Sequence, residues 1–133
     1  MTRQTVNPDT LFNSLQHGFS QIAIGQGTRF VTISGQVGWD VNKQIVGKHD
    51  LQTQTMESFK NLERAMTAVG GTLDDILSLR IYILDSVLSE KVAVKEGLQA
   101  FFPTNPPTST WIGVPALASG DFLIEIEAFA ILP

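Results

Sequence analysis

The sequence predicts a single α+β domain in which two helices pack on one face of a sheet. Strand-like alternation of apolar and polar residues dominates both ends of the chain, and two segments between them repeat apolar residues at helical steps of three and four. No repeat, linker or low-complexity tract divides the chain. Because 43% of the 133 residues are hydrophobic, the chain can bury one core, and we expect residues 1–133 to form one domain.

The first strand is predicted in the stretch RFVTISGQVGW, where Val31 and Ile33 alternate with residues of the opposite face. Gly35 and Gly38 then permit a bulge or a close approach of another group to the backbone. The stretch DVNKQIVG predicts a turn and a short return strand, so we expect a hairpin in the N-terminal part.

The first helix is predicted from Leu51 to Val69. Its apolar stripe consists of Met56, Phe59, Leu62, Met66 and Val69. Asp50 stands in the N-cap position, and Gly70 and Gly71 follow the last turn, where glycine readily takes the left-handed C-cap conformation.

The stretch ILSLRIYILD predicts the next strand, with two different faces. One face carries Leu77, Leu79, Ile81 and Ile83, and the other carries Ser78, Arg80 and Tyr82. A second helix is expected to begin at a cap on Asp85 or Ser86 and to run to Phe102, where Pro103 ends it. Its stripe consists of Val87, Val94, Leu98 and Phe101, with Lys91 and Lys95 on or beside its edge.

Two further strands are predicted in TWIGVPAL and in DFLIEIEAFAIL. In the last strand, Ile124, Ile126, Ala128 and Ala130 form a small apolar face suited to helix packing, and Leu123, Glu125, Glu127, Phe129 and Ile131 form the other face. We expect this mixed, helix-free face to be buried against another subunit of a symmetric oligomer, with Arg80 and Tyr82 as partners of its acids. The alternative is a partly wet face on which Arg80 makes a surface ion pair worth about 0–1 kcal/mol.

Composition excludes several classes of function. With 13 acidic and 9 basic residues the net charge is −4, so nucleic acid is a poor default partner. The chain has no cysteine, and His17 and His49 are too few for a metal cluster, so we expect no metal. No apolar run has the length of a signal peptide or a membrane span, and we expect a soluble cytoplasmic protein that does not contact a membrane.

Eight segments spread in order over nearly the whole chain resemble the RidA/YjgF family, which is also labelled the L-PSP endoribonuclease family. They are GFSQ at 18–21, ISGQVG at 33–38, QT at 54–55, NLERAM at 61–66, GGTLDDIL at 70–77, YILD at 82–85, FFP at 101–103 and IEIEAFA at 124–130. Each segment alone is a weak signal, but their joint spacing is specific.

The resemblance implies a chorismate-mutase-like fold, with a six-stranded, mostly antiparallel mixed sheet and two helices on one face. It implies a homotrimer whose sheets line the inside, with small-molecule clefts between neighbouring subunits. The family's best understood chemistry is hydrolysis of reactive enamines and imines, such as 2-aminoacrylate, to a 2-keto acid and ammonia, without a metal or organic cofactor.

Carried over residue by residue, the resemblance makes Glu125 the catalytic, water-handling acid, and Ser34 and Gly35 part of the pocket backbone. The usual tyrosine of the N-terminal motif falls at Phe19, so the ring is kept and the hydroxyl is lost. An asparagine that lines the cleft falls near Lys95.

The largest departure from the family lies in NPPTSTW, where deaminating members carry Pro-x-Arg-Ser and the arginine grips the substrate carboxylate. Here Ser109 stands in place of the arginine, followed by Thr110 and Trp111. A charge-assisted bond of this kind contributes about 1.5–3 kcal/mol, which a serine hydroxyl cannot replace. Lys95 could supply the missing charge, or its stem could simply lie beside the apolar stripe.

Alternatives remain open at each of these residues. Glu125 is either catalytic or a structural interface acid paired with Arg80, and Glu127 is expected to be structural. The indole of Trp111 is either subunit packing or a flat wall for a ligand larger than a small amino-acid imine. Two functions follow: an imine or enamine hydrolase with altered specificity, or a trimeric metabolite-binding or regulatory protein without turnover. Ribonuclease activity fits poorly with the net charge.

Overall fold

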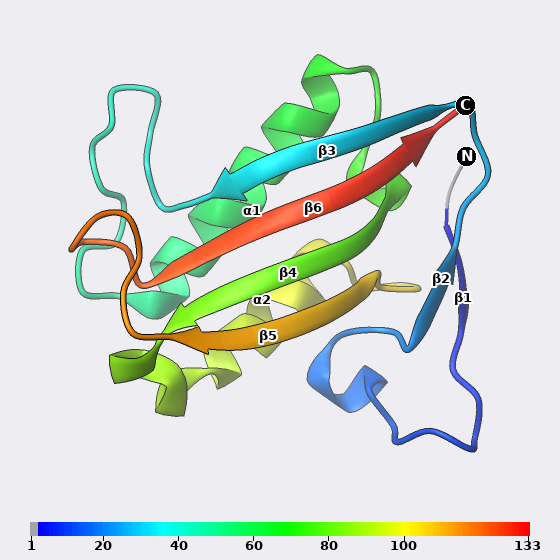
Figure 1. Ribbon diagram of the computed structural model, residues 1–133, viewed down its shortest axis with the longest axis horizontal. Helices are drawn as coiled ribbons and strands as arrows, with labels where there is room; N and C mark the ends of the chain where they lie inside the picture. The colour runs from blue at the N-terminus through cyan, green and yellow to red at the C-terminus, as the bar shows by residue number, and fades with distance from the viewer. Residues whose placement is uncertain (1–2) are drawn as a thin grey trace.

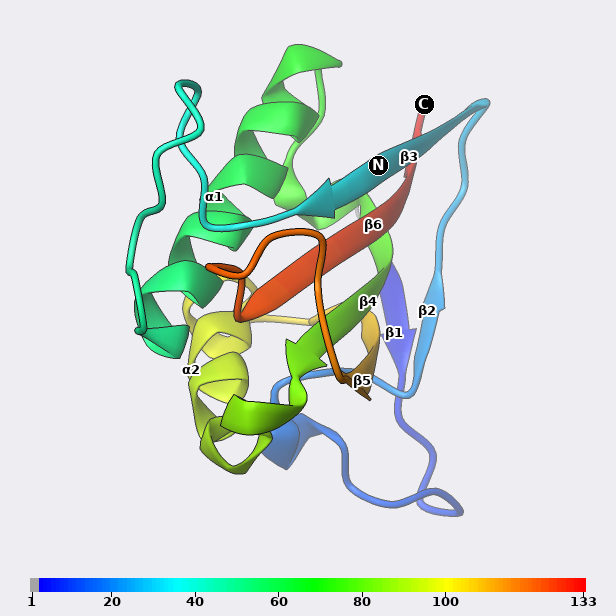
Figure 2. The same ribbon diagram turned by 60° about the vertical axis from the view of Figure 1, so that its left-hand side comes forward.

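The computed structural model describes residues 3–133 and has the predicted α+β architecture, with a layer of two helices against one face of a sheet (Figures 1 and 2). The strands are β1 (Gln4–Val6), β2 (Ile22–Ile24), β3 (Arg29–Gln36), β4 (Ile76–Leu84), β5 (Thr108–Val114) and β6 (Ile124–Leu132). The helices are α1 (Leu51–Ala68) and α2 (Val92–Phe101), with short 3₁₀ turns at Leu15–His17, Leu73–Asp75 and Asp85–Glu90.

The described strands form two sheets rather than the expected single six-stranded one. The main sheet has the order β3-β6-β4-β5, in which only the β4–β5 pair is parallel, and β1 and β2 form a separate antiparallel ribbon. The ribbon lies beyond the end of the sheet where β3 begins (Figure 1). Parallel neighbours need a crossover, and α2 lies in the connection between β4 and β5.

The predicted hairpin after β3 is wrong. β3 pairs with β6, and the expected return strand is reduced to one bridge between Trp39 and Ile45. Asp40 explains this, because its Oδ1 accepts hydrogen bonds from the backbone N–H groups of Asn42 (2.8 Å) and Gln44 (2.9 Å). These bonds close a tight loop that leaves no length for a strand.

Helix α1 begins and ends next to the predicted capping residues. The Asp50 side chain accepts a hydrogen bond from the Thr53 N–H at 3.2 Å, and Gly70 takes a left-handed φ of 81°. The expected start of the second helix is wrong, since neither Asp85 nor Ser86 caps it and the chain forms a 3₁₀ turn before α2. This turn packs closely on β5 at Gly113, where an added Cβ would lie 3.0 Å from Leu88.

One residue of β4 points to the face opposite to the predicted one. A register shift between Ile76 and Ser78 places Ile76 fully inside the core and turns Leu77 outward, toward Ile131 and Gly25. A bulge of this kind reverses the alternation that the sequence suggests.

The core lies between the helices and the sheet and contains the predicted apolar residues of β6. Its largest fully buried members are Phe59, Leu62, Met66, Ile76, Leu79, Ile81, Ile83, Leu98, Ile124, Ile126 and Leu132. Gln54 is also fully buried. Its Nε2 donates to the carbonyls of Gly47 and Asp121, and its Oε1 accepts from the Leu123 N–H at 2.9 Å. These bonds tie α1 to the loops at one end of the sheet.

Candidate functional site

Glu125 and Gly35 lie against each other on the helix-free face of the sheet. Glu125 is a half-buried residue of β6, opposite Tyr82 of β4. A register shift between Ile33 and Gln36 marks the bulge that the glycine pattern permits. A Cβ added at Gly35 would lie only 2.6 Å from Cγ and Cδ of Glu125, so the missing side chain makes room for the acid.

The neighbouring side chains of Arg80 and Tyr82 interact with Glu127 rather than with Glu125. Arg80 Nη1 lies 3.8 Å from Glu127 Oε1, and the Tyr82 hydroxyl donates a hydrogen bond of 2.6 Å to the same oxygen. This hydrogen bond, followed by partial desolvation, raises the pKa of Tyr82. Arg80 therefore does not neutralise Glu125, whose carboxylate has no hydrogen bond or ion pair to any residue in 3–133.

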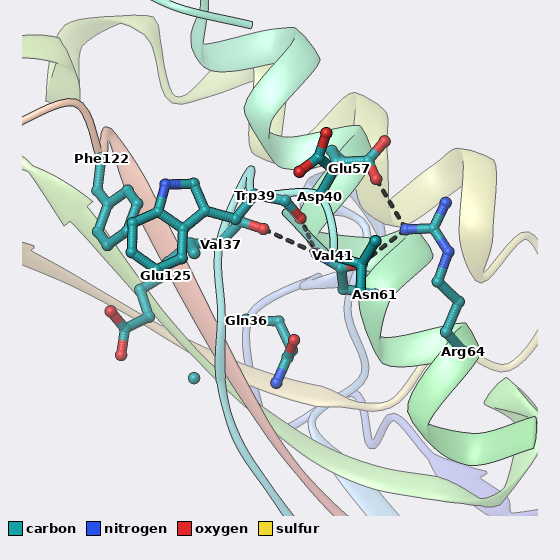
Figure 3. A pocket seen from close by; sticks show the side chains of 11 residues that line it. Gln36, Val37, Trp39, Asp40, Val41, Glu57, Asn61, Arg64, Phe122 and Glu125 are labelled. Carbon is teal, nitrogen blue, oxygen red and sulfur yellow. Dashed lines mark hydrogen bonds and ion pairs between the residues drawn. The ribbon is translucent and has the colours of Figure 1, made fainter. Parts of the chain in front are cut away.

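A hollow of about 640 Å³ opens beside Glu125, between the end of β3 and α1 (Figure 3). One wall is aromatic, because the rings of Trp39 and Phe122 meet edge to face with centroids 4.7 Å apart. Glu125 lies at the end of the hollow next to this wall (Figure 3), and Gly35 also lines the hollow.

The opposite end of the hollow is polar and is held together by α1. Asn61 Nδ2 donates to the carbonyls of Val37 (2.9 Å) and Trp39 (3.0 Å). Arg64 Nη1 donates to Asn61 Oδ1 and to Glu57 Oε2, both at 2.7 Å. These bonds fix the 37–39 segment on the helix. No motif in the sequence singles out these residues as part of a site. The available signal is their helical spacing, since Glu57, Asn61 and Arg64 share one helix face at spacings of four and three.

A second group of predicted site residues gathers at the outer edge of β5. Trp111 Nε1 donates a hydrogen bond of 2.9 Å to Ser109 Oγ, and the ring of Phe19 lies 6.0 Å from the indole. Ser20 forms an isolated parallel β-bridge with Thr108, and its backbone N–H donates a hydrogen bond of 3.1 Å to the Pro107 carbonyl. These contacts hold the N-terminal segment against this edge.

The two groups lie on opposite faces of the sheet. Ser109 and Trp111 pair with Leu79 and Ile81, whose side chains enter the core on the helix side. Glu125 instead stands on the helix-free face. One copy of the chain therefore does not bring Glu125 to Ser109.

The remaining predicted residues join neither group closely. Thr110 pairs with Arg80, so it faces away from Ser109. Ser34 is exposed, and its carbonyl accepts a hydrogen bond from Gln36 Nε2. Lys95 is a half-buried residue of α2 whose backbone carbonyl packs near Gly18, and within residues 3–133 its ammonium makes no ion pair.

Within the described part of the chain, no group of three or more His, Asp or Glu residues has the arrangement of a metal site. A search of the same residues for a helix of sufficient length and apolarity to span a membrane finds none.

The family model described as Endoribonuclease L-PSP matches residues 13–132. The chain belongs to this family, the RidA/YjgF family. A solved structure of a Rid-family protein of unknown function, YyfB from Yersinia pestis, is 36% identical with a TM-score of 0.93, covering 99% of this chain and 100% of that one. The RutC family protein PH0854 of Pyrococcus horikoshii is 29% identical over 101 residues, 76% of this chain and 78% of that protein.

A more distant RidA/YjgF relative carries the name of an activity. The protein called 2-iminobutanoate/2-iminopropanoate deaminase in Dermatophagoides farinae is 22% identical over 102 residues, 77% of each chain. The structural neighbours support the α+β fold expected for the family.

Proposed function

We propose that this chain is a Rid-type hydrolase of an imine or enamine, with Glu125 as its catalytic residue. The observation that carries the proposal is the carboxylate of Glu125, which is half-buried beside the hollow with no partner within residues 3–133. Arg80, which could have neutralised it, and Tyr82, which could have donated a hydrogen bond to it, interact with Glu127 instead. The deaminase name of the Dermatophagoides relative supports the reaction class.

The proposed reaction adds water across a C=N bond and releases ammonia. Ionised Glu125 takes a proton from water while the water oxygen bonds to the imine carbon, and the imine nitrogen takes up a proton. The resulting carbinolamine collapses to C=O as the C–N bond breaks, and the nitrogen leaves as ammonia with the protons it has gained. No oxidant or reductant is needed.

The complete site is proposed to form between neighbouring copies in a homotrimer. One copy would supply Glu125 and Gly35, and its neighbour would supply Ser109 and Phe19. The helix-free face carries apolar rings suited to burial, since Phe30 is 74% exposed and lies 5.7 Å from Phe129. Light scattering should give a mass of about three times 14.5 kDa. The mass of a single chain would rule out a cleft between subunits.

The activity is tested with imines made by oxidases and competing semicarbazide. We expect carboxylate-free imines to be hydrolysed, Glu125→Gln to abolish the activity, and exposed Glu63→Gln to retain it. Amino-acid imines should be poor substrates until Ser109→Arg restores the carboxylate grip. Rapid hydrolysis of 2-aminoacrylate by the unmodified protein, lost in Glu125→Gln, would show that loss of the arginine did not redirect specificity.

The second candidate is a binding or regulatory protein that holds a metabolite without turnover. The occupied hydroxyl of Ser109 favours it, because the oxygen that replaces the family's arginine already accepts the indole N–H of Trp111. Absence of turnover in both the unmodified protein and Ser109→Arg, with every imine offered, would select this candidate. The family's endoribonuclease label fits less well, since a net charge of −4 repels a polyanion.

A further inference from the structure

Four rings form a continuous aromatic cluster beside Ser109. The ring centroids of Phe12, His17 and Phe19 are 6.4 Å apart in each of the three pairs. The centroid of Phe19 is also 6.0 Å from that of Trp111. These spacings are within the range of favourable ring–ring contacts. The cluster runs from the edge of the core to the surface, because Trp111 is half-buried against the core whereas Phe12 is 62% exposed and His17 is exposed as well.

The backbone holds this cluster in place. Gly18 takes a left-handed φ of 91°, and its Cα packs against Leu98 of α2 so closely that an added Cβ would lie 3.0 Å from the leucine Cβ. His17 and Gly18 donate backbone hydrogen bonds of 2.8 and 3.0 Å to the carbonyls of Ser14 and Leu15. At the other end, the bond to Ser109 fixes the plane of the Trp111 indole. The rings therefore form a preorganised surface, which lowers the entropy cost of binding.

We infer that the aromatic cluster binds a flat aromatic group of the substrate and makes the protein selective for aryl imines. The inference rests on the proposed function and names its substrate class. The position that the resemblance gives to the family's carboxylate grip here carries a neutral hydroxyl, and the rings of Phe19 and Trp111 beside it offer stacking faces.

A second copy of the chain is the competing occupant of these rings. The other large exposed rings, Phe30 and Phe129, lie on the helix-free face, whereas the aromatic cluster lies at the β5 edge and includes a polar imidazole. Ser109 also keeps a hydroxyl proton to donate, since its bond to Trp111 uses only an oxygen lone pair. A small ligand with a ring and a polar atom matches this combination better than a second apolar surface.

The reaction balances without a further reactant. An aryl imine and water give the aryl aldehyde or ketone and ammonia, through loss of the C–N bond and gain of a C–O bond. The supplying reaction is a two-electron oxidation of an aryl amine without a carboxylate, in which the oxidising enzyme's own acceptor takes the electrons.

The inference is tested by pairing imines that differ only in the ring, one made from benzylamine and one from cyclohexylmethylamine. Stacking on two rings predicts about a tenfold higher kcat/KM for the aryl member. Phe12→Ala should reduce this ratio. Leu11→Ala, a change at an exposed apolar neighbour outside the cluster, should leave the ratio unchanged. Equal rates for the two imines, with Glu125→Gln inactive, would refute aryl selectivity while leaving the proposed hydrolase intact.

A binding measurement separates the inference from turnover. The NMR signal of the Trp111 indole N–H, assigned with Trp111→Phe, should shift with benzylamine and not with cyclohexylmethylamine. That result without hydrolysis of any imine would support aryl binding and reject the hydrolase. No selective shift, or a fall in oligomer mass caused by Phe12→Ala, would overturn the inference, and the mass change would identify the cluster as subunit packing.

Discussion

Substitution of Gly35 by alanine should strain the protein through Glu125. The new Cβ would lie 2.6 Å from Cγ and Cδ of Glu125, whereas carbon atoms in favourable contact are about 3.5–4.0 Å apart. Either the acid moves by about 1 Å or β3 separates from β6. We expect a loss of about 1–3 kcal/mol in the free energy of unfolding, measured by urea denaturation. A shift of about 1 Å in the acid should also lower turnover by about 100-fold if Glu125 is catalytic.

A double-mutant cycle separates this clash from a general effect of alanine in a strand. In a Glu125→Ala background the atoms that collide with the new methyl are gone, so the cost of Gly35→Ala should largely vanish, with a coupling of about 1–2 kcal/mol. Gly120→Ala is the matched control, because nothing lies within 4 Å of its added Cβ. An identical cost of Gly35→Ala in both backgrounds would refute the contact with Glu125 as the cause.

Three further measurements test the supports of the fold and the polar network. Gln54→Ala should cost about 3 kcal/mol in the free energy of unfolding measured with urea, because one buried and two partly buried backbone groups lose their partner. Exposed Gln52→Ala should cost little, and equal losses would contradict this. Arg3→Met should cost about 2–3 kcal/mol, since the guanidinium donates to three backbone carbonyls within the fold, and an unchanged urea midpoint would be inconsistent with those bonds. Tyr82, the one tyrosine, should titrate above about 10 in an ultraviolet pH titration, and Glu127→Gln should return it toward that value. The raised pKa means that the folded state favours the neutral phenol. The stabilisation by the Tyr82–Glu127 hydrogen bond is therefore complete below about pH 10 and is lost as the pH rises through the pKa of folded Tyr82. Coincident titration curves of the unmodified protein and Glu127→Gln would argue against the bond.

Local signals in the sequence predicted the parts of the fold that depend on local chemistry. Asp50 and Gly70 mark the two ends of α1, because capping needs only neighbouring residues. The alternation in β6 correctly separates its core residues from Glu125, Glu127 and Phe129, but Leu123, expected on the helix-free face, belongs to the core. Strand pairing and bulges depend on distant residues. The pairing of β3 with β6 and the outward turn of Leu77 were therefore not visible in the pattern.

The candidate site shows the same division. The resemblance brought Gly35 and Glu125 to attention, and the structure places them in contact. It did not indicate the hollow beside them. Asn61 reaches the backbone carbonyls of Val37 and Trp39, in a loop of irregular backbone, and Arg64 holds the Asn61 side chain. The helical spacing of these residues shows that they share a face, but it does not show which distant loop that face contacts.

The position of the aromatic and acidic groups on opposite faces has a consequence for specificity. The chemistry proposed for Glu125 and the recognition proposed for Ser109 belong to different strands that are not neighbours in the sheet, since β4 lies between β6 and β5. A change in the recognition edge therefore leaves the packing around the acid unaltered. On the proposed function, Ser109 stands in place of the arginine of deaminating members, and Trp111, bound to its hydroxyl, redirects the ligand while the acid and the Gly35 backbone stay in place. For this reason the substrate must be sought through the chemistry of the β5 edge, and the reaction through that of β6.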